Sequence, residues 1–404
     1  MSKPMCRNNL ILCMKTNRFW ILLLICFSLF PEDLLGCTSI IITGKLTKDG
    51  RPLLLKQRDG GNENNRIESF HGEKYDFITL VNSEYVQKDL AWCGINEMGL
   101  AITSNASNNL GNRENGGYSS PKVIYLALAK CKNLQEFECL LDSIKLFVPT
   151  NFGAIDAGGG AAYYEVGETN WTKFDVNDPS VAPDGYLVRT NFSFSGNMLE
   201  QNGIERYRAA NKIVAEHLGK KDFSAKWIFN NICRSFRRED LKHDLSKLRK
   251  NVGTSTYFDE SKYIASQYSV ASVVFQGVRV DESPRNAVMW TLLGWAPTGF
   301  VVPLQVNRIL PAYVQSKNDT DLNSILCDQS IHLKRRVFIK KGNLKELDKQ
   351  LLFGSRGLLN NIRGIERNMF GTFEKKGRNF SDEELHAFYG KYNNEIMHYY
   401  QYIK

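Results

Sequence analysis

Residues 34–43 read Leu-Leu-Gly-Cys-Thr-Ser-Ile-Ile-Ile-Thr, and this stretch decides how the chain folds. The segment Thr38–Thr43 is rich in β-branched residues, which favour strands. An apolar segment with the composition of an export signal ends just before it, so the first strand of the folded protein opens at Cys37. If the chain is cut before Cys37, that residue carries a free α-amine beside its thiol.

A cysteine that begins a chain is a complete catalytic unit. Its thiolate is the attacking form, and the unperturbed thiol pKa is about 8.5, whereas an α-amine titrates at about 7.7 to 8.0. The amine can therefore accept the thiol proton at neutral pH without help from a histidine. We expect Cys37 to be a nucleophile that uses its own α-amine as the base.

The N-terminus has the pattern of a secretory signal. Lys15 and Arg18 precede the apolar run Trp20–Phe30, and these are the charged and hydrophobic parts of such a signal. The run is too short to span a bilayer comfortably. We therefore predict that residues 1–36 are a signal peptide and that the protein is exported, which means periplasmic, secreted or at the cell surface.

Cys37 also fits a different role, because Leu34–Cys37 resembles the lipobox of a lipoprotein signal. Lipidation would use the thiol and block the amine, and the protein would then be a membrane-anchored binding scaffold. Two features argue against it. Leu35 is larger than the usual residue at its position, and a strand rather than a flexible linker follows the cysteine. We favour the nucleophile and keep the surface lipoprotein as the alternative.

The composition argues against several other classes of function. The chain has 404 residues, of which 43% are hydrophobic and 11% aromatic, and its net charge is +9. Lysines and arginines are spread along it without a recognition motif, so no nucleic-acid partner is expected. Neither a CxxC pair nor an HExxH pattern occurs, so we expect no metal and no cofactor. Disulfide pairing stays open, and a homo-oligomer is compatible with the sequence.

The chain after Cys37 has the pattern of a β-hairpin. Asp49 and Gly50 lie between the first strand and a second apolar run that ends at Asp59. With the turn at Asp49-Gly50, antiparallel pairing returns the chain so that Asp59 lies near Cys37. The carboxylate can then hold and orient the new ammonium group. A simple turn carboxylate is the other interpretation of Asp59.

The rest of the sequence alternates between strand and helix patterns. Strands are expected at 77–81, 90–105, 151–156, 161–166, 185–192, 268–278, 287–293 and 300–304. Helical spacing predicts two helices within 121–147, others at 204–217 and 225–236, and mostly helix from 321 onward. We predict a catalytic domain at 37–310 and a helical C-terminal extension at 311–404 that packs on the same domain.

Several short motifs follow one another in order: Cys37-Thr38, the Asp-Gly hairpin, Arg58-Asp59, the Asn96–Ala101 turn with Asn105, and Thr190-Asn191-Phe192. In this order they resemble the N-terminal nucleophile hydrolases of the choloylglycine hydrolase, penicillin V acylase and acyl-CoA:6-aminopenicillanate acyltransferase superfamily, over about residues 37–305. The resemblance implies an α+β fold, a four-layer αββα sandwich. It also implies hydrolysis of a linear amide in a small-molecule substrate, with an acyltransferase as the alternative.

The resemblance implies roles for individual residues. Cys37 would be the nucleophile, and Asp59 would orient its amine. Asn105 and Asn191 would complete the site, with an asparagine amide helping to bind the oxyanion. An amide at a strand end can donate a hydrogen bond to a developing negative oxygen, which agrees with this role. Both asparagines also fit strand-end caps, and each begins a glycosylation sequon.

The sequence departs from the superfamily pattern just before Asp59. Related bile-salt and penicillin V enzymes usually have an arginine three residues before the aspartate, where this chain has Lys56. Arg58 directly precedes Asp59 and is the arginine candidate for the site. Neighbouring residues on a strand point to opposite faces, so Arg58 and Asp59 are expected to face apart. The sequence does not identify a later catalytic arginine.

Overall fold

The computed structural model describes residues 36–84, 89–111, 116–146, 148–167, 170–238, 244–246, 255–257, 262–341, 344–376 and 379–403. Leu35–Lys404 form one compact unit. The predicted signal peptide, apart from Gly36, lies outside the described residues.

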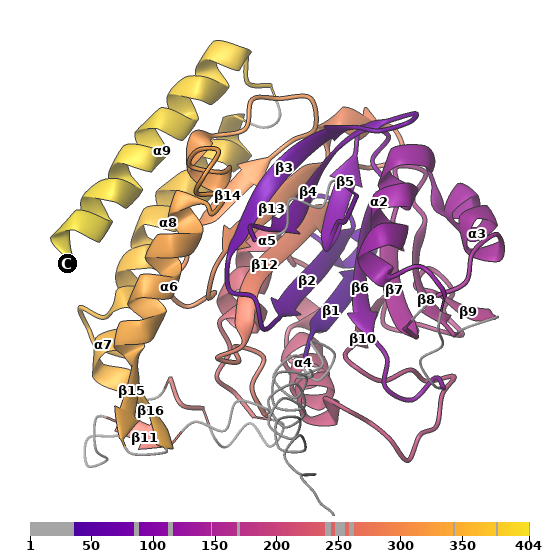
Figure 1. Ribbon diagram of the computed structural model, residues 1–404, viewed down its shortest axis with the longest axis horizontal. Helices are drawn as coiled ribbons and strands as arrows, with labels where there is room; N and C mark the ends of the chain where they lie inside the picture. The colour runs from indigo at the N-terminus through magenta and orange to yellow at the C-terminus, as the bar shows by residue number, and fades with distance from the viewer. Residues whose placement is uncertain are drawn as a thin grey trace, which may run out of the picture. The chain divides into compact units, whose positions relative to one another are not determined.

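One antiparallel sheet has six strands in the order β10-β1-β2-β12-β13-β14 (Figure 1). Its strands are β1 (Thr38–Ile42), β2 (Leu53–Asp59), β10 (Tyr186–Arg189), β12 (Ser269–Gln276), β13 (Val288–Leu293) and β14 (Val301–Leu304). Every residue of β1 and β2 is buried. Both faces of the sheet are covered, which explains why β1 contains an unbroken run of isoleucines instead of an alternating pattern.

A second antiparallel sheet has seven strands in chain order, from β3 to β9. They are β3 (Asn65–His71), β4 (Asp76–Asn82), β5 (Cys93–Asn96), β6 (Ala101–Ala106), β7 (Thr150–Ile155), β8 (Ala161–Val166) and β9 (Trp171–Asp175). The predicted turn after Asn96 joins β5 to β6, and Gly99 has a φ of 80° there, which glycine adopts without strain. A small third sheet contains β11 (Ser255–Tyr257), β15 (Phe338–Lys341) and β16 (Leu344–Asp348).

The two large sheets stack face to face between layers of helices. Strands β1 and β2 contact β6 and β7 across the interface. The outer face of the seven-stranded sheet is covered by α2 (Ser120–Lys130) and α3 (Leu134–Asp142). The six-stranded sheet is contacted by α4 (Ile204–Ala215) and by α5 (Ala225–Ile228), which continues into the π-helix Phe229–Cys233. This order of layers confirms the predicted αββα sandwich (Figure 1).

The C-terminal region is mostly helical, as the sequence predicts. Its helices are α6 (Ile325–Val337), α7 (Lys349–Phe353), α8 (Leu358–Lys376) and α9 (Asp382–Tyr402). They lie on the β13–β14 side of the six-stranded sheet (Figure 1), where Trp290 stacks on Phe370 with ring centroids 4.8 Å apart. Short 3-10 helices occur at Gly44–Leu46, Leu218–Lys220, Pro284–Asn286 and Ala312–Val314.

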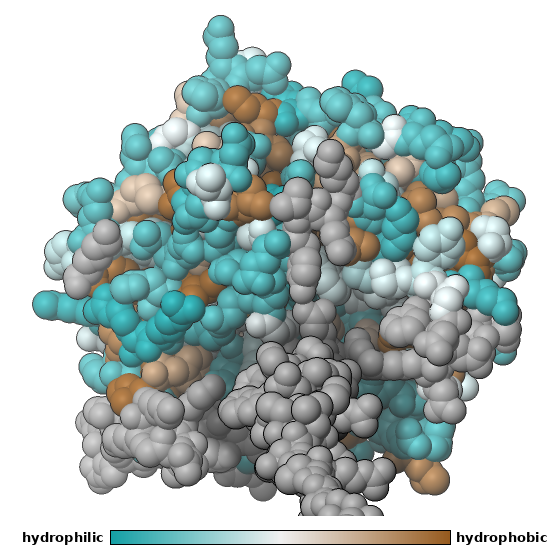
Figure 2. Space-filling model, in the orientation of Figure 1, coloured by the Kyte–Doolittle hydropathy of each residue, from teal (hydrophilic) through white to brown (hydrophobic). Residues whose placement is uncertain are grey.

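The surface in Figure 2 is mostly hydrophilic, and hydrophobic side chains occupy small separate areas of it. Within the described ranges, no helix has the length and apolar character to cross a bilayer. The same part of the chain holds no group of three or more histidine, cysteine or acidic side chains placed to bind a metal ion. Its cysteines are free thiols: Cys37, Cys93, Cys131, Cys139, Cys233 and Cys327.

Candidate active site

The β1–β2 hairpin places Cys37 at the end of β2, as the sequence predicts. Thr38 pairs with Gln57 in the antiparallel register, so Cys37 comes opposite Arg58. The Cys37 Sγ lies 3.8 Å from the backbone oxygen of Asp59. Cys37 is only half-buried, although β1 itself is fully buried. The hairpin therefore brings the predicted nucleophile and the predicted acidic residue together at a partly open strand end.

The Asp59 carboxylate is buried at the end of β2. Its Oδ1 accepts a hydrogen bond of 2.7 Å from the Ser269 hydroxyl on β12. Burial raises the pKa of Asp59 to about 6 because the charged form loses its hydration, while Arg206, Ser269 and Lys56 act in the opposite direction. Asp59 is therefore a carboxylate that changes its charge close to neutral pH.

Arg206, near the start of α4, reaches into this site, and the sequence alone does not predict its role. Its guanidinium donates to the backbone oxygen of Cys37 and, at 3.2 Å, to the Thr38 hydroxyl. It also donates to Oδ1 of Asn191 at 3.0 Å. Burial lowers the pKa of Arg206, while Asp59 and Cys37 favour its charged form. Arg206 thus connects the residue that would be the nucleophile to Asn191.

The pattern of α4 contains a signal that could have revealed this arginine. Buried residues on the helix are Arg206, Ala209, Ala210, Ile213 and Val214, which lie on one face. A charged side chain on the apolar face of a helix needs polar partners inside the protein. An arginine in such a stripe, soon after a predicted site residue, is therefore a candidate for the same site.

Two glycines leave room for the Arg206 guanidinium. Gly36 and Gly203 lie against it, and a Cβ added at either position would collide with the guanidinium. Gly203 also has a φ of 79° at the start of α4, which favours glycine for a second reason. A residue larger than glycine before Cys37 would therefore require the Arg206 guanidinium to shift.

The two predicted asparagines are both buried but are held differently. Nδ2 of Asn105 donates to the Ser39 hydroxyl at 2.9 Å and to the backbone oxygen of Arg189 at 3.1 Å, which uses both amide hydrogens. Nδ2 of Asn191 donates to the backbone oxygen of Ala106 at 3.0 Å, and this bond uses only one of its two amide hydrogens. Asn191 is therefore the better placed donor for a substrate oxygen. Burial also keeps both sequons away from the surface of the folded protein.

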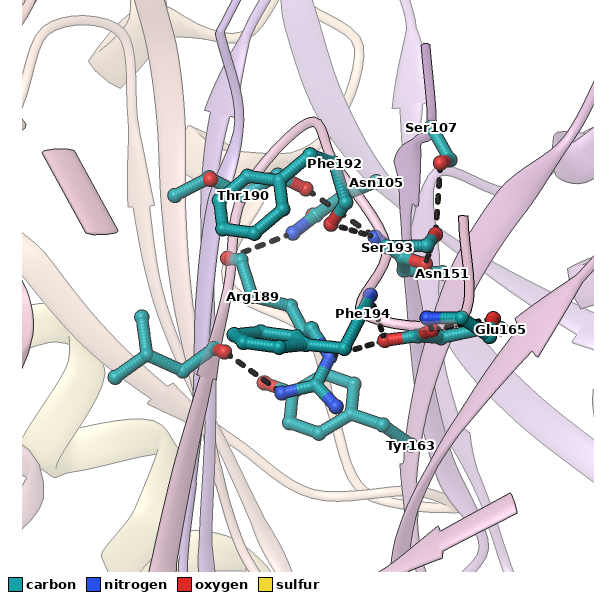
Figure 3. A network of polar contacts seen from close by, with 12 residues as sticks. Asn105, Ser107, Asn151, Tyr163, Glu165, Arg189, Thr190, Phe192, Ser193 and Phe194 are labelled. Carbon is teal, nitrogen blue, oxygen red and sulfur yellow. Dashed lines mark hydrogen bonds and ion pairs between the residues drawn. The ribbon is translucent and has the colours of Figure 1, made fainter. Parts of the chain in front are cut away.

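A buried polar network holds the segment that carries Asn191 (Figure 3). Arg189 Nε and Glu165 Oε1 form an ion pair of 2.8 Å, and their side chains are 3% and 0% exposed. Glu165 also accepts hydrogen bonds from the backbone amides of Phe194 and Ser195, at 3.0 and 2.7 Å. Since Glu165 belongs to β8, the seven-stranded sheet fixes the chain on both sides of Asn191.

Lys56 and Arg58 point from β2 toward the seven-stranded sheet, on the face opposite to Asp59. The Lys56 ammonium donates to a backbone oxygen of β6 and, at 3.0 Å, to Oδ1 of Asn105. Arg58 donates to Oδ1 of Asn65 at 2.9 Å, and its guanidinium lies 4.2 Å from the centroid of the Trp92 ring. Lys56 therefore contacts a predicted site residue, whereas Arg58 is directed toward β3 and the start of β5.

Residues 47–238 match the family model described as acyl-coenzyme A:6-aminopenicillanic acid acyl-transferase. The match covers just under half of the chain and agrees with the resemblance to the N-terminal nucleophile hydrolase superfamily. The matched range contains Asp59, Asn105, Asn191 and Arg206, and it begins ten residues after Cys37. The resemblance seen in the sequence is thereby confirmed for the superfamily. No curated protein sequence matches the chain significantly.

Three solved structures illustrate what this chain is similar to. A conjugated bile acid hydrolase from Clostridium perfringens has 11% identity, covers 67% of this chain and 92% of that one, and gives a TM-score of 0.41. An N-acylethanolamine-hydrolyzing acid amidase ortholog from Caenorhabditis elegans has 17% identity, covers 66% of this chain and 100% of that one, and gives a TM-score of 0.41. Penicillin V acylase from Agrobacterium tumefaciens has 12% identity, covers 67% of this chain and 86% of that one, and gives a TM-score of 0.36.

Proposed function

We propose that the protein is an exported N-terminal-cysteine amidohydrolase that cleaves a linear N-acyl amide in a small molecule through an acyl-enzyme thioester. The observation that carries this proposal is the position of Cys37. Its half-buried thiol lies 3.8 Å from the backbone of Asp59, and its carbonyl is held by Arg206. The match of residues 47–238 to an acyl-transferring family supports the same chemistry.

In the proposed reaction, removal of residues 1–36 frees the α-amine of Cys37. The amine takes the thiol proton, and the thiolate attacks the carbonyl carbon of the substrate. An amide hydrogen of Asn191 bonds the developing oxyanion. The C–N bond then breaks while the ammonium returns the proton to the leaving amine. Water, activated by the same amine, hydrolyses the thioester to a carboxylic acid.

Two charged groups would set the protonation of this amine. The Asp59 carboxylate favours the ammonium form and orients it, whereas the Arg206 cation disfavours a second positive charge nearby. Together they would keep the amine oriented and still basic at neutral pH. Because burial raises the pKa of Asp59 to about 6, we expect hydrolysis to decline as the pH falls through this value.

Acyl transfer is the other fate of the thioester, and the matched family is named for it. We favour water over a second amine as the acceptor, because acyl-coenzyme A is not expected outside the cytoplasm. A cell-surface lipoprotein that binds rather than cleaves its ligand remains the non-enzymatic alternative, since lipidation of Cys37 would consume the thiol.

The proposal is tested first by the intact mass and N-terminal sequence of the protein purified from its native export route. We expect a chain that begins with unmodified Cys37. That protein is then assayed on a panel of N-acyl 7-amino-4-methylcoumarin amides, with acyl groups from phenylacetyl to palmitoyl. Cys37→Ala should abolish hydrolysis. Cys139→Ala, which removes the exposed thiol of α3, should leave it unchanged.

Three results would refute the proposal: a chain cut elsewhere, an acyl or diacylglyceryl adduct on Cys37, or hydrolysis that survives Cys37→Ala. The adduct would establish the lipoprotein alternative. Iodoacetamide provides an independent check, because alkylation of Cys37 should abolish hydrolysis.

A further inference from the structure

Helix α6 begins against the segment that follows Asp59 in the chain. The Ser324 hydroxyl, which caps this helix, donates to the backbone oxygen of Asn65 at 2.9 Å. The Cys327 thiol donates to the backbone oxygen of Glu63 at 3.2 Å and accepts from the backbone N–H of Asn65 at 3.3 Å. A helix from the C-terminal region thus binds the start of β3 and the chain just before it.

An ion pair strengthens this contact. The Lys334 ammonium, on the last turns of α6, pairs with Oε1 of Glu63. Lys334 is a buried lysine with 8% of its surface exposed. Arg335 also reaches Glu63, at 3.4 Å, but its side chain is 74% exposed, so solvent screens that contact. Lys334 is therefore the main cation that holds Glu63.

The same contact continues to the strand that carries the hydrogen-bond partner of Asp59. Asn65 accepts from Arg58 at 2.9 Å and donates to the backbone oxygen of Val270 at 3.3 Å. Val270 follows Ser269, whose hydroxyl donates to the Asp59 carboxylate. A displacement of the segment held by α6 would therefore reach β2 and β12 together.

Positive charges on three elements favour the charged form of the buried Asp59 carboxylate. Arg206 of α4 has the largest effect, followed by Lys56 of β2 and Lys334 of α6. Ser269 of β12 donates a hydrogen bond to it, and Cys37 approaches its backbone from the start of β1. Lys334 thus lies close enough to Asp59 to favour the charged carboxylate, although it comes from a helix outside the range 47–238 that matches the family.

We propose that Lys334 is a positioning residue for the reaction: through its ion pair with Glu63 it anchors the segment between Asp59 and β3, and with it the surroundings of the Asp59 carboxylate. The C-terminal helices then belong to the catalytic machinery and not only to the scaffold. This inference rests on the proposed function, because it assigns Asp59 a role in orienting the Cys37 amine.

The test compares the pH dependence of kcat/KM for four variants on the coumarin amide that the wild-type protein hydrolyses best. Lys334→Met removes a positive charge near Asp59. The acidic limb of the profile should therefore move to higher pH by about half a pH unit. Glu63→Gln removes the anion that neutralises Lys334, so the acidic limb should move to lower pH. A merely structural contact would lower kcat/KM in both variants without moving the limbs in opposite directions.

Two matched variants serve as controls. Lys334→Arg keeps the charge, so its acidic limb should lie within about 0.2 pH units of the wild-type limb. This limit is the precision of such profiles, and it is smaller than the pKa shift that a nearby charge typically causes. Arg335→Met removes the neighbouring cation, which also contacts Glu63 but whose side chain is 74% exposed, and it should leave the limb in place because solvent screens this charge. Thermal unfolding of each variant, measured by circular dichroism, shows whether it is folded at the assay temperature.

The outcomes separate this inference from the proposed function. If the wild-type protein hydrolyses amides through Cys37 but Lys334→Met and Glu63→Gln leave the limb unmoved or move it in the same direction, the role of Lys334 is refuted and the proposed function stands. If Lys334→Met does not fold, an unchanged profile of Glu63→Gln would refute the role of Lys334 equally. If the wild-type protein hydrolyses none of the amides, the role of Lys334 and the proposed function are both refuted.

Discussion

The Asp59 carboxylate lies in a place that disfavours its charge, because burial removes its hydration and raises its pKa to about 6. An aspartate in the unfolded chain has a pKa near 3.8. The folded protein therefore binds this proton more tightly than the unfolded chain does. The corresponding stability is fully present below pH 3.8 and is lost as the pH rises through about 6.

We predict that Asp59→Asn makes the protein more stable and inactive at pH 8. The neutral amide avoids the charge that burial disfavours, so the free energy of unfolding should rise by up to about 3 kcal/mol. The gain should shrink as the pH falls from 6 toward 4, where the wild-type carboxyl is itself protonated. Urea unfolding of both proteins at pH 5 and pH 8 measures the difference. A variant that is less stable than wild type at pH 8 would contradict the prediction.

The sequence predicted the parts of the site that local geometry determines. The Asp-Gly turn sets the register of the hairpin, and this register brings Asp59 to Cys37. Arg206 could not be predicted in the same way, because its position depends on how α4 lies against the six-stranded sheet. Arg58 was predicted as a candidate from its place beside Asp59. It lies at the strand position opposite Cys37, and strand alternation turns its side chain away from Asp59, to a hydrogen bond with Asn65.

Strand β10 and the chain after it are positioned by the other sheet. Glu165 of β8 accepts from the Arg189 side chain and from two backbone amides beyond Asn191. The Arg189 guanidinium also lies between aromatic rings, 5.2 Å from Tyr163 and 4.6 Å from Phe194. A single carboxylate thus orders the segment that presents the proposed oxyanion donor.

We predict that Glu165→Gln destabilises the protein strongly. The substitution leaves the Arg189 charge buried without its partner, which typically costs about 3–5 kcal/mol. Replacing both residues, as in Glu165→Leu with Arg189→Met, should cost less than the single change. Urea unfolding checks both values, and Lys173→Met, which removes a more exposed ion pair with Glu138, should change stability by less than about 1 kcal/mol. A single variant as stable as Lys173→Met would contradict the prediction.

Hydrophobic periodicity and turn residues were sufficient to predict most strands and helices. The order of strands within the six-stranded sheet was not accessible, because β10 pairs with β1 and β12 pairs with β2 across long stretches of chain. Such pairings are chosen by packing between distant segments. The pattern within each strand does not contain that information.

Across the whole molecule, a buried ion pair joins the C-terminal helices to the sandwich. Glu366 of α8 accepts two hydrogen bonds of 2.7 Å from Arg234, which follows the π-helix, and one of 2.9 Å from the backbone of Val301 on β14. Arg234 also donates to the backbone oxygens of Ala296 and Gly299. The Arg234 guanidinium therefore links its own segment to the chain before β14 and to α8. Side chains of the C-terminal helices also belong to the main hydrophobic core.

We predict that Glu366→Gln destabilises residues 35–404 as one cooperative unit. The uncompensated Arg234 charge should cost about 3–5 kcal/mol, and the loss should appear in a single unfolding transition. Thermal unfolding followed by circular dichroism and by tryptophan fluorescence tests this, because the two signals should coincide. Asp382→Asn, at an ion pair whose aspartate is 84% exposed, should cost less than about 1 kcal/mol. A separate early transition of the C-terminal helices would contradict the prediction.

The collision that a Cβ at Gly36 would make with Arg206 has a practical consequence for producing the protein. A recombinant leader or affinity tag joined directly to Cys37 is best ended in glycine, because a larger residue there would require the Arg206 guanidinium to shift before the leader is removed. A fusion partner that ends in glycine and is cut by a protease specific for its fold satisfies this requirement. It also leaves Cys37 as the first residue of the product.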